Sequence, residues 1–168
     1  MPSNAGRGPA WPHWKWRDPE LEPGPAVIFD MDGVLSDAAT RQHFIERGRR
    51  DWHAFFEACG EDPLIEDVAR LIDLLDEDLR LVLLTGRPLR VQPQTLAWLD
   101  RYKLRWDLLI MRHVGDYSAA REFKQDAVYD LRAAGFELQL AFEDDRRNLE
   151  MFRSEGVPCI YIHSGYYD

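Results

Sequence analysis

Apolar residues gather in short, uninterrupted runs from residue 26 onward. A run that is apolar at every position suits a parallel strand covered on both faces, whereas a half-exposed strand would alternate apolar and polar residues. We therefore predict five strands, at Ala26–Phe29, Leu81–Leu84, Leu108–Met111, Leu138–Phe142 and Ile160–Ile162.

Helical patterns fill the spaces between these runs. Asp62 and Pro63 have the form of a helix cap and first turn, and apolar residues then recur at helical spacing as far as Leu79. Three further helices are predicted, over Pro93–Tyr102, Ala119–Ala134 and Asp145–Glu155. Because strands and helices alternate, we expect an α/β fold with a doubly wound, Rossmann-like parallel sheet of about five strands.

The first 25 residues do not fit this alternation. Residues 1–25 contain proline, glycine and three tryptophans, Trp11, Trp14 and Trp16, with no helical or strand period. We expect an irregular N-terminal arm whose tryptophans pack on the body of the protein, since a folded domain would cover them. Stacking of the three rings on nucleic-acid bases is the functional alternative.

A second irregular segment lies between the first strand and its crossover helix. Residues 36–62 are too few for a domain of their own, so we predict a small cap of one or two short helices. The cap would be an insertion into a single domain of residues 26–168.

Composition and charge narrow the class of protein. The chain has 168 residues, of which 45% are hydrophobic, enough for one domain with a real core. Its net charge of −9 argues against a protein that coats nucleic acid without sequence preference, but it allows a local cationic pocket for one phosphate. Cys59 and Cys159 form no disulfide framework and are predicted to be buried thiols. Met1–Glu22 lacks the pattern of a signal peptide and no apolar run could span a bilayer, so we expect a cytoplasmic protein.

Polar residues follow four of the predicted strands. Ligands of open parallel sheets bind at the carboxyl ends of the strands, so these residues are the first candidates for a site. They are Asp30, Asp32 and Gly33 after the first strand, Thr85, Gly86 and Arg87 after the second, Arg112 after the third with Lys124 on the following helix, and Glu143, Asp144 and Asp145 after the fourth.

Aspartates gathered at one edge would repel one another unless a divalent cation lay between them. Mg²⁺ suits a site of a few carboxylates together with phosphate oxygens. Lys124, Thr85 and Arg87 would supply a positive charge and donors around a phosphoryl group. Each signal alone could be a turn, a solvated lysine or a helix cap, but their ordered combination indicates phosphoryl transfer.

This motif set resembles that of the haloacid dehalogenase-like (HAD) phosphohydrolases, whose pattern is an apolar strand with DxDG, a strand ending in Ser or Thr, a lysine, and a strand ending in Asp-Asp. The matching segments are Val27–Val34, Leu83–Arg87, Lys124 and Phe142–Asp145.

The resemblance implies the roles of the site residues. Asp30 would attack phosphorus and form an aspartyl-phosphate, while Asp32 would act as general acid and then general base. Thr85 and Lys124 would stabilise the phosphoryl group and complete the catalytic set. Mg²⁺ would be held by Asp30, the main-chain carbonyl of Asp32, Asp144 and Asp145. An aspartate at position 32 is typical of the phosphatases of this superfamily and is absent from its dehalogenases.

A narrower resemblance is to the 3′-phosphatase domain of phage-type polynucleotide kinases. It rests on the second half of the chain, including Ile110–Arg112, Gly115–Tyr117 and Ser164–Gly165. It implies a substrate phosphate at the 3′ end of DNA or RNA. The substrate-binding residues that we carry over are Arg41, Gly86, Arg87 and Arg112.

Two positions depart from the family pattern. An aspartate is common four residues before the lysine, where this chain has Ala120, and we expect its loss to weaken the orientation of Lys124. Glu143 stands where an apolar residue is commoner and would add negative charge beside the metal.

The remaining features bear on the substrate. No GxxxxGK[ST] loop is present, so we expect dephosphorylation without a kinase module. A cap of only residues 36–62 would leave the site open to a polymer end, and the basic run Arg47–Arg50 would border it. Two alternatives stay open: a phosphatase of small molecules such as nucleotides or sugar phosphates, and a catalytically retired binding domain.

Overall fold

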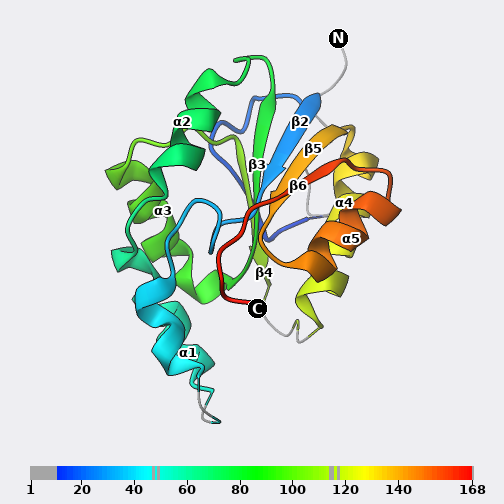
Figure 1. Cartoon of the computed structure of the whole chain (residues 1–168). Helices are drawn as coiled ribbons and strands as arrows, with labels where there is room; N and C mark the ends of the chain where they lie inside the picture. Colours follow the sequence, from blue (N-terminus) through cyan, green and yellow to red (C-terminus); the bar gives the residue numbers. More distant parts are fainter. Residues whose placement is uncertain (1–10, 47, 49, 114–115, 117, 168) are drawn as a thin grey trace.

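One mixed sheet forms the centre of the molecule (Figure 1). The computed structural model describes residues 11–46, 48, 50–113, 116 and 118–167. The strands are β1 (Trp14–Trp16), β2 (Pro25–Phe29), β3 (Arg80–Pro88), β4 (Leu108–Arg112), β5 (Glu137–Glu143) and β6 (Cys159–Tyr161). Their order in the sheet is β1-β4-β3-β2-β5-β6, and β2 to β6 run parallel. The predicted doubly wound parallel sheet of five strands is confirmed.

The sixth strand, β1, corrects the prediction of a wholly irregular arm. It pairs antiparallel with β4, with Trp14 opposite Ile110. Three residues are too few to show a strand period, so the sequence carried no signal for it. The tryptophans pack inward as expected: the Trp16 ring lies 5.7 Å from that of Phe136, and Trp11 stacks on Trp14 at 4.7 Å. These contacts favour packing over base stacking.

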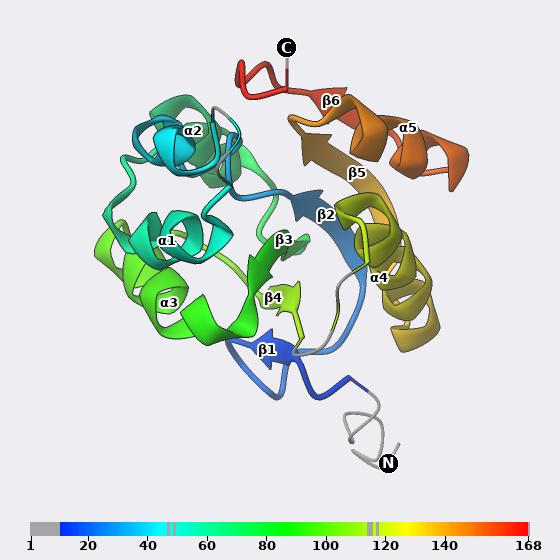
Figure 2. The ribbon, with the colours of Figure 1, turned by 90° about the horizontal axis from the view of Figure 1, so that it is seen from below.

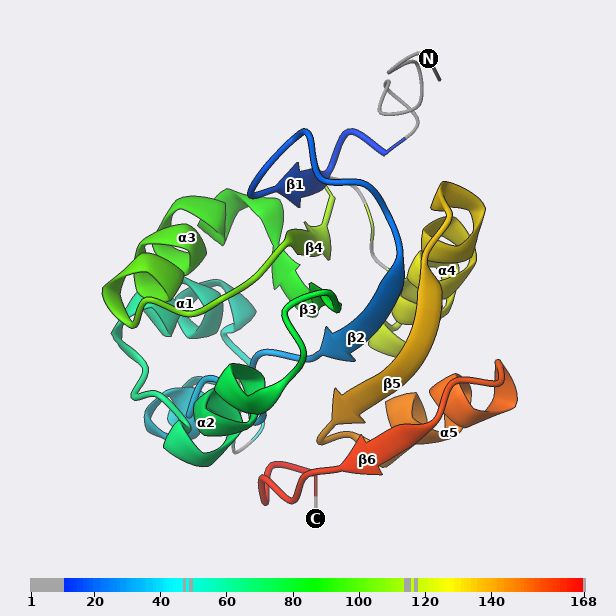
Figure 3. The same cartoon turned by 90° about the horizontal axis from the view of Figure 1, so that it is seen from above.

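Helices cover both faces of the sheet (Figures 2 and 3). They are α1 (Trp52–Glu57), α2 (Glu66–Leu74), α3 (Gln92–Arg101), α4 (Ala120–Ala134) and α5 (Arg146–Ser154), with short 3-10 segments η1 (Ala39–Phe44), η2 (Ala58–Glu61) and η3 (Leu89–Val91). α2 and α3 pack on one face, and α4 and α5 on the other. The helix predicted to extend from Asp62 to Leu79 is shorter: α2 has Ile65 as its N-cap and ends at Leu74.

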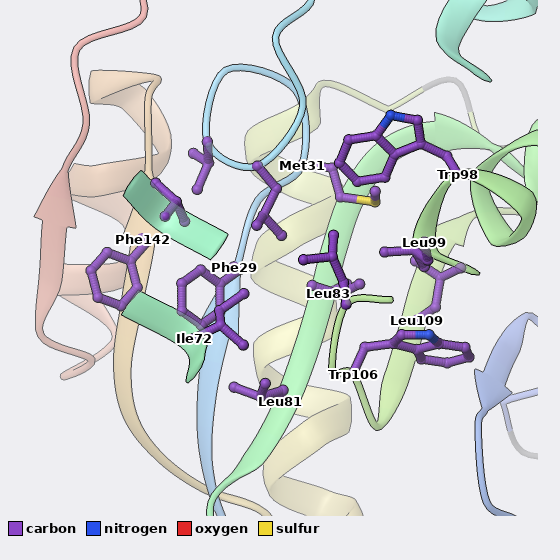
Figure 4. Close-up of a cluster of buried hydrophobic side chains, with 14 of the residues drawn as sticks. Phe29, Met31, Ile72, Leu81, Leu83, Trp98, Leu99, Trp106, Leu109 and Phe142 are labelled. Atoms are coloured by element: carbon purple, nitrogen blue, oxygen red, sulfur yellow. The ribbon is translucent and has the colours of Figure 1, made fainter. Parts of the chain in front are cut away.

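The two hydrophobic cores explain the uninterrupted apolar runs. Val27 and Phe29 of β2 belong to the core beneath α2 and α3, together with Trp98 (Figure 4). The alternate residues Ala26 and Ile28 belong to the core beneath α4 and α5. Because successive side chains of a strand point to opposite faces, a strand covered on both faces must be apolar throughout.

The segment between β2 and α2, which was predicted to be a cap, holds the short helices η1, α1 and η2. The cap is fastened to the body by hydrogen bonds. Trp98 of α3 donates from Nε1 to the main-chain oxygen of Asp62 at 2.8 Å, and Arg90 forms an ion pair with Glu57 of α1. This attachment fixes where the cap presents its side chains to the sheet edge.

The remaining structural expectations concern cysteines and membrane segments. Cys59 and Cys159 are both buried and free, as predicted. Among the helices of the described residues, none is both long and apolar enough to cross a membrane.

Candidate active site

The candidate site lies at the carboxyl ends of the parallel strands, the side from which Figure 2 is drawn. Asp30 directly follows β2, and its main-chain nitrogen donates to Phe142 of β5 at 3.1 Å. β3 does not end at Leu84 as predicted but continues to Pro88, which pairs with Arg112 after a register shift. The shift occurs across Thr85 to Arg87, so these residues leave the regular ladder at the site.

Three carboxylates meet at this edge. Asp30, Glu143 and Asp144 each offer an oxygen, and these oxygens lie within 4.8 Å of one another; we call the three residues the acidic cluster. Lys124 of α4 lies against it, with Nζ 3.0 Å from Asp30 Oδ1 and 2.8 Å from Glu143 Oε2. Burial alone would lower the pKa of Lys124, but Asp30 and Glu143 outweigh it and raise that pKa above its ordinary value. Lys124 therefore stays charged.

One lysine does not balance three carboxylates in a buried place. Burial, reinforced by the charge of Asp30, raises the pKa of both Glu143 and Asp144. Both side-chain oxygens of Asp144 are buried without a hydrogen-bond partner among the described residues, and the nearby Ser164 side chain, which lowers the pKa of Asp144, does not offset the effects that raise it. A buried carboxylate without a donor is costly, and a divalent cation with oxygen ligands would satisfy it. The acidic cluster therefore fits a hard cation such as Mg²⁺.

Glu143 also corrects an expectation about Lys124. Ala120 was expected to leave the lysine poorly oriented, but the Glu143 carboxylate accepts a hydrogen bond from Lys124 Nζ at 2.8 Å. Both side chains are almost fully buried, so the pair is fixed. The residue that seemed only to add negative charge supplies the orientation that the missing aspartate would have given.

Asp32 lies beside the acidic cluster and is held by two buried arginines. Its Oδ1 accepts from Arg41 Nη2 at 2.8 Å and from Arg87 Nη2 at 2.6 Å, and 20% of its side chain is exposed. Burial opposes ionisation of Asp32, but the two guanidinium groups outweigh it and lower its pKa to about 2. Asp32 is therefore ionised and aimed by both arginines.

A second carboxylate, Asp62 of the cap, forms ion pairs with the same two arginines. It accepts from Arg41 Nε at 2.7 Å and Nη2 at 2.6 Å, and it also accepts from the hydroxyl of Ser36. Thr95 of α3 accepts from Arg87 Nη1 at 3.1 Å. The prediction that Asp62 caps a helix is wrong, because its side chain binds Arg41 and α2 begins after Ile65. No local pattern marks this role, since the partners come from separate parts of the chain.

Gly33 closes the loop after Asp32 against the acidic cluster. Its φ is +86°, and a Cβ placed there would lie 2.1 Å from Asp144 Oδ2. Only glycine combines this backbone conformation with such a close approach. The DxDG motif thus needs its glycine to let Asp144 approach the loop.

Three further predicted phosphate-binding residues, Thr85, Gly86 and Arg112, come from the ends of β3 and β4. Thr85 is buried, and its hydroxyl accepts from the main-chain nitrogen of Arg87 at 3.2 Å. Arg112 donates to Ser118 O at 2.8 Å, and its Nη2 would be 3.8 Å from a Cβ at Gly86. Its Nε is buried with no acceptor among the described residues, so it could donate to a bound anion.

Asp145 lies outside the acidic cluster. Its carboxylate caps α5 by accepting from the main-chain nitrogen of Arg147 at 2.9 Å, and it also binds the Arg147 guanidinium at 3.0 Å. The side chain of Asp32, like that of Asp145, binds arginine and is not part of the acidic cluster. Glu143, by contrast, is a member that the predicted metal set lacked. Arg47, Arg49, Gly115 and Tyr117 lie outside the described residues.

Comparison with known proteins agrees with this arrangement. Residues 24–167 match the family model of the polynucleotide kinase PNKP phosphatase domain. A solved structure of the Pnkp1/Rnl/Hen1 RNA repair complex contains a chain that is 25% identical, with a TM-score of 0.71; the match covers 90% of this chain and 46% of that one. This chain thus spans about half the length of that relative.

A class C acid phosphatase from Bacillus anthracis, solved with tungstate bound, shares the fold at 14% identity and a TM-score of 0.57, covering 88% of this chain and 70% of that chain. The family match spans the five parallel strands, the cap and the polar residues that meet at the sheet edge. This chain is therefore a phosphatase and belongs to the HAD-type family of the polynucleotide kinase phosphatase domain.

Proposed function

We propose that this phosphatase is a Mg²⁺-dependent phosphomonoesterase of the cytoplasm that removes 3′-phosphates from the ends of nucleic acids through an aspartyl-phosphate intermediate. The observation that carries the proposal is the setting of Asp30: its carboxylate is 3.0 Å from Lys124 Nζ, beside an Asp144 carboxylate without a donor among the described residues. A fixed carboxylate beside a buried cation, next to oxygens suited to a metal, is the arrangement that a phosphoryl-transfer nucleophile needs.

In the first step, an oxygen of Asp30 attacks phosphorus, and the bond between phosphorus and the 3′ oxygen breaks. Asp32 gives a proton to the departing oxygen, which leaves as a 3′-hydroxyl. Asp32 is ionised in the structure because Arg41 and Arg87 hold it. A substrate phosphate would compete for the same guanidinium groups and bring negative charge near, so Asp32 would take up a proton as substrate binds.

In the second step, water attacks the phosphorus of the aspartyl-phosphate. Asp32, now ionised, accepts a proton from that water, and the bond between phosphorus and Asp30 breaks to release inorganic phosphate. Thr85 and Lys124 donate to the phosphoryl oxygens in both steps. The carboxylate of Asp30 is restored at the end.

Asp30, Asp144 and the main-chain carbonyl of Asp32 would hold Mg²⁺, and Glu143 would stay with Lys124. The ion would offset the negative charge of the acidic cluster and of the phosphate. Asp145 would keep Asp144 in place by capping α5.

The proposed substrate rests on the family and on the cap. The family is that of a polynucleotide kinase phosphatase domain, and one relative is part of an RNA repair complex. Within a catalytic domain of residues 26–168, the short cap of residues 36–62 would leave room for a polymer end. Arg41 and Arg87, which both donate to Asp32 Oδ1, would contact the phosphate together, and Gly86 and Arg112 would contact it as well.

The test is phosphate release from a panel of esters in Mg²⁺ and in EDTA, with Asp30→Asn as the blank. The panel holds a 3′-phosphorylated oligonucleotide, its 5′-phosphorylated isomer, 3′- and 5′-mononucleotides and p-nitrophenyl phosphate. We expect the 3′-phosphorylated oligonucleotide to be the best substrate, in Mg²⁺ only. Faster hydrolysis of mononucleotides would show that the substrate is a small molecule and not a polymer end. Activity of Asp30→Asn would show that Asp30 is not the nucleophile.

A further inference from the structure

Two tyrosine–arginine pairs lie at the rim of the candidate site. The guanidinium of Arg147 is 5.9 Å from the centre of the Tyr167 ring, and that of Arg146 is 5.5 Å from the Tyr161 ring. We call these four residues the tyrosine–arginine strip. Such spacing is that of a cation–π contact.

The chain sets the strip directly beside the acidic cluster. Arg146 and Arg147 are the two residues after Asp145, and they begin α5. Tyr161 ends β6 and pairs in register with Glu143 of β5. Figures 1 and 3 show β6 lying alongside α5, with the C-terminal segment continuing from β6 toward the carboxyl ends of the strands.

Tyr167 lies close enough to the acidic cluster for the charges of the cluster to act on its phenol. Its hydroxyl is desolvated, and the charges of Asp144 and Asp30 add to that burial in raising its pKa. Yet 55% of the residue is exposed, so Tyr167 offers surface to solvent while the charges of the acidic cluster still act on its hydroxyl. An aromatic ring in that position is available for contact with a substrate that is bound at Asp30.

The arginines of the strip are exposed cations on an acidic protein. The Arg147 side chain is 72% exposed and is anchored by Asp145, while Arg146 is exposed and lies over Tyr161. The chain as a whole has 30 acidic and 21 basic residues, so its net charge repels nucleic acid. Affinity for a polyanion must therefore come from local groups of this kind.

We propose that the tyrosine–arginine strip binds the last two nucleotides of a single-stranded 3′ end, with the terminal base on Tyr167 and the preceding base on Tyr161. Arg146 and Arg147 contact the phosphodiester between these two nucleotides and the one that precedes them. Aromatic rings interleaved with cations are the usual means of holding single strands without reading their sequence. The inference rests on the proposed function, since the 3′-phosphate at Asp30 sets which end of the strand lies on the strip.

The tryptophans of the arm, the other aromatic group in question, are less suited to this role. Trp14 and Trp16 turn toward Phe136, which precedes β5 at the opposite edge of the sheet from Asp30. Tyr161 and Tyr167 belong to the segment that leads to the site. The structure thus moves the candidate base-stacking surface from the arm to the C-terminal segment.

The test compares hydrolysis of a 3′-phosphorylated dT oligonucleotide with that of p-nitrophenyl phosphate. The readout is the ratio of kcat/KM for the oligonucleotide to kcat/KM for the small ester. For Tyr167→Ala and Tyr161→Ala we expect this ratio to fall about tenfold each, through KM of the oligonucleotide, because each loses one stacked base. Tyr167→Phe keeps the ring and is expected to keep the ratio.

The matched control is Tyr129→Ala, which removes a ring that is 53% exposed on α4. Its ratio is expected to equal that of the wild type. A thermal unfolding curve of every variant separates loss of the strip from loss of the fold.

Binding is measured independently of turnover, as the fluorescence anisotropy of a 5′-fluorescein-labelled dT oligonucleotide with a 3′-phosphate in EDTA. Weaker binding by Tyr167→Ala and Arg146→Ala, with unchanged binding by Tyr129→Ala, supports the strip. Equal ratios and equal affinities in all variants would overturn the strip while leaving a phosphatase of p-nitrophenyl phosphate intact. An oligonucleotide that the wild type neither binds nor hydrolyses would overturn both the strip and the proposed substrate.

Discussion

At the scale of single residues, the environment of Asp144 does not suit a negative charge. Its buried oxygens have no donor among the described residues, and burial with the nearby Asp30 raises its pKa. A carboxyl whose pKa is raised on folding stabilises the protein at low pH and loses that contribution as pH rises through the raised value. The metal-free protein is thus expected to lose stability as the pH rises from about 4 to about 9.

Asp144→Asn should therefore stabilise the metal-free protein and abolish its response to Mg²⁺. In EDTA at pH 8 the variant is expected to have a Tm several degrees higher, corresponding to about 1–3 kcal/mol for a buried unsatisfied group. Mg²⁺ should raise the Tm of the wild type but not that of the variant. Thermal unfolding with and without Mg²⁺ checks both, and a wild-type Tm indifferent to Mg²⁺ would contradict the metal site.

The pKa of Asp32 is shifted in the opposite direction to that of Asp144, so its effect on stability has the opposite dependence on pH. Its pKa is lowered from 3.8 to about 2 by Arg87 and Arg41, against the effect of burial. Its ion pairs therefore stabilise the fold fully above about pH 4, and roughly 2 kcal/mol is lost as pH falls from there to about 2. Asp32→Asn should be less stable near neutral pH and show a flatter fall between those two values. Urea denaturation across this range measures the difference, and parallel curves would show that Asp32 is not paired in solution.

At the scale of elements, α4 and β5 together orient Lys124. In Glu143→Leu the lysine loses its partner at 2.8 Å, and kcat is expected to fall about ten- to a hundredfold. Adding Ala120→Asp puts a carboxylate one turn before Lys124 on the same helix, where it can accept the lost hydrogen bond. The double variant should recover most of kcat. Ala120→Asn in the same background is the uncharged control, and equal recovery by both would argue against a role for the ion pair.

The loop between β2 and the cap gives a second prediction, because Gly33 touches Asp144. Gly33→Ala is expected to lose activity and metal-dependent stabilisation, since the new Cβ would occupy the space of the Asp144 carboxylate. Gly135→Ala is the matched control: its φ is +104°, but the nearest atom to a Cβ is Pro23 Cβ at 3.6 Å. Both variants should lose about 1–2 kcal/mol to backbone strain, but only Gly33→Ala should lose phosphate release. Loss of activity in both would show that strain, and not the contact, matters.

An element could be predicted from the sequence where neighbouring residues alone determine it, and not where it depends on contacts with distant segments. The parallel strands were predictable because burial on both faces leaves a continuous apolar run, and the meeting of Asp30, Lys124 and Asp144 followed from the rule that strand ends share an edge. β1 was missed because three residues show no period. The extension of β3 to Pro88 depends on pairing with Arg112, which no segment of sequence displays on its own.

The same limit applies to the site. Asp62 looked like a helix cap because its neighbour is a proline, and only the folded cap brings it to Arg41. Glu143 was noticed as unusual, but its partner could not be read from the sequence, since Lys124 lies on another element. Local chemistry thus predicted that Asp30, Lys124 and Asp144 meet at one edge of the sheet, while the groups that orient them needed the three-dimensional structure.

At the scale of the whole molecule, charge decides how a polymer substrate could be recognised. A net charge of −9 gives nucleic acid no general attraction, so binding has to come from the few cations at the carboxyl edge of the sheet. Arg146 and Arg147 are exposed there, whereas Arg41 and Arg87 are buried with Asp32 and Asp62. The protein should therefore contact only a few nucleotides, and its affinity for them should depend weakly on salt concentration.

This reasoning predicts how KM varies with oligonucleotide length and with salt. If two arginines of the tyrosine–arginine strip neutralise two phosphates, log KM should rise with log salt concentration with a slope of about 1.4. KM for 3′-phosphorylated dT should fall from one to about three nucleotides and then stay level, because the strip holds two bases and the second phosphate that it contacts joins them to a third nucleotide. Steady-state kinetics over lengths from one to about twenty nucleotides measures both quantities. A KM that keeps falling with length, or a much steeper slope, would mean that a larger cationic surface guides the strand and that the acidic body is not a barrier to it.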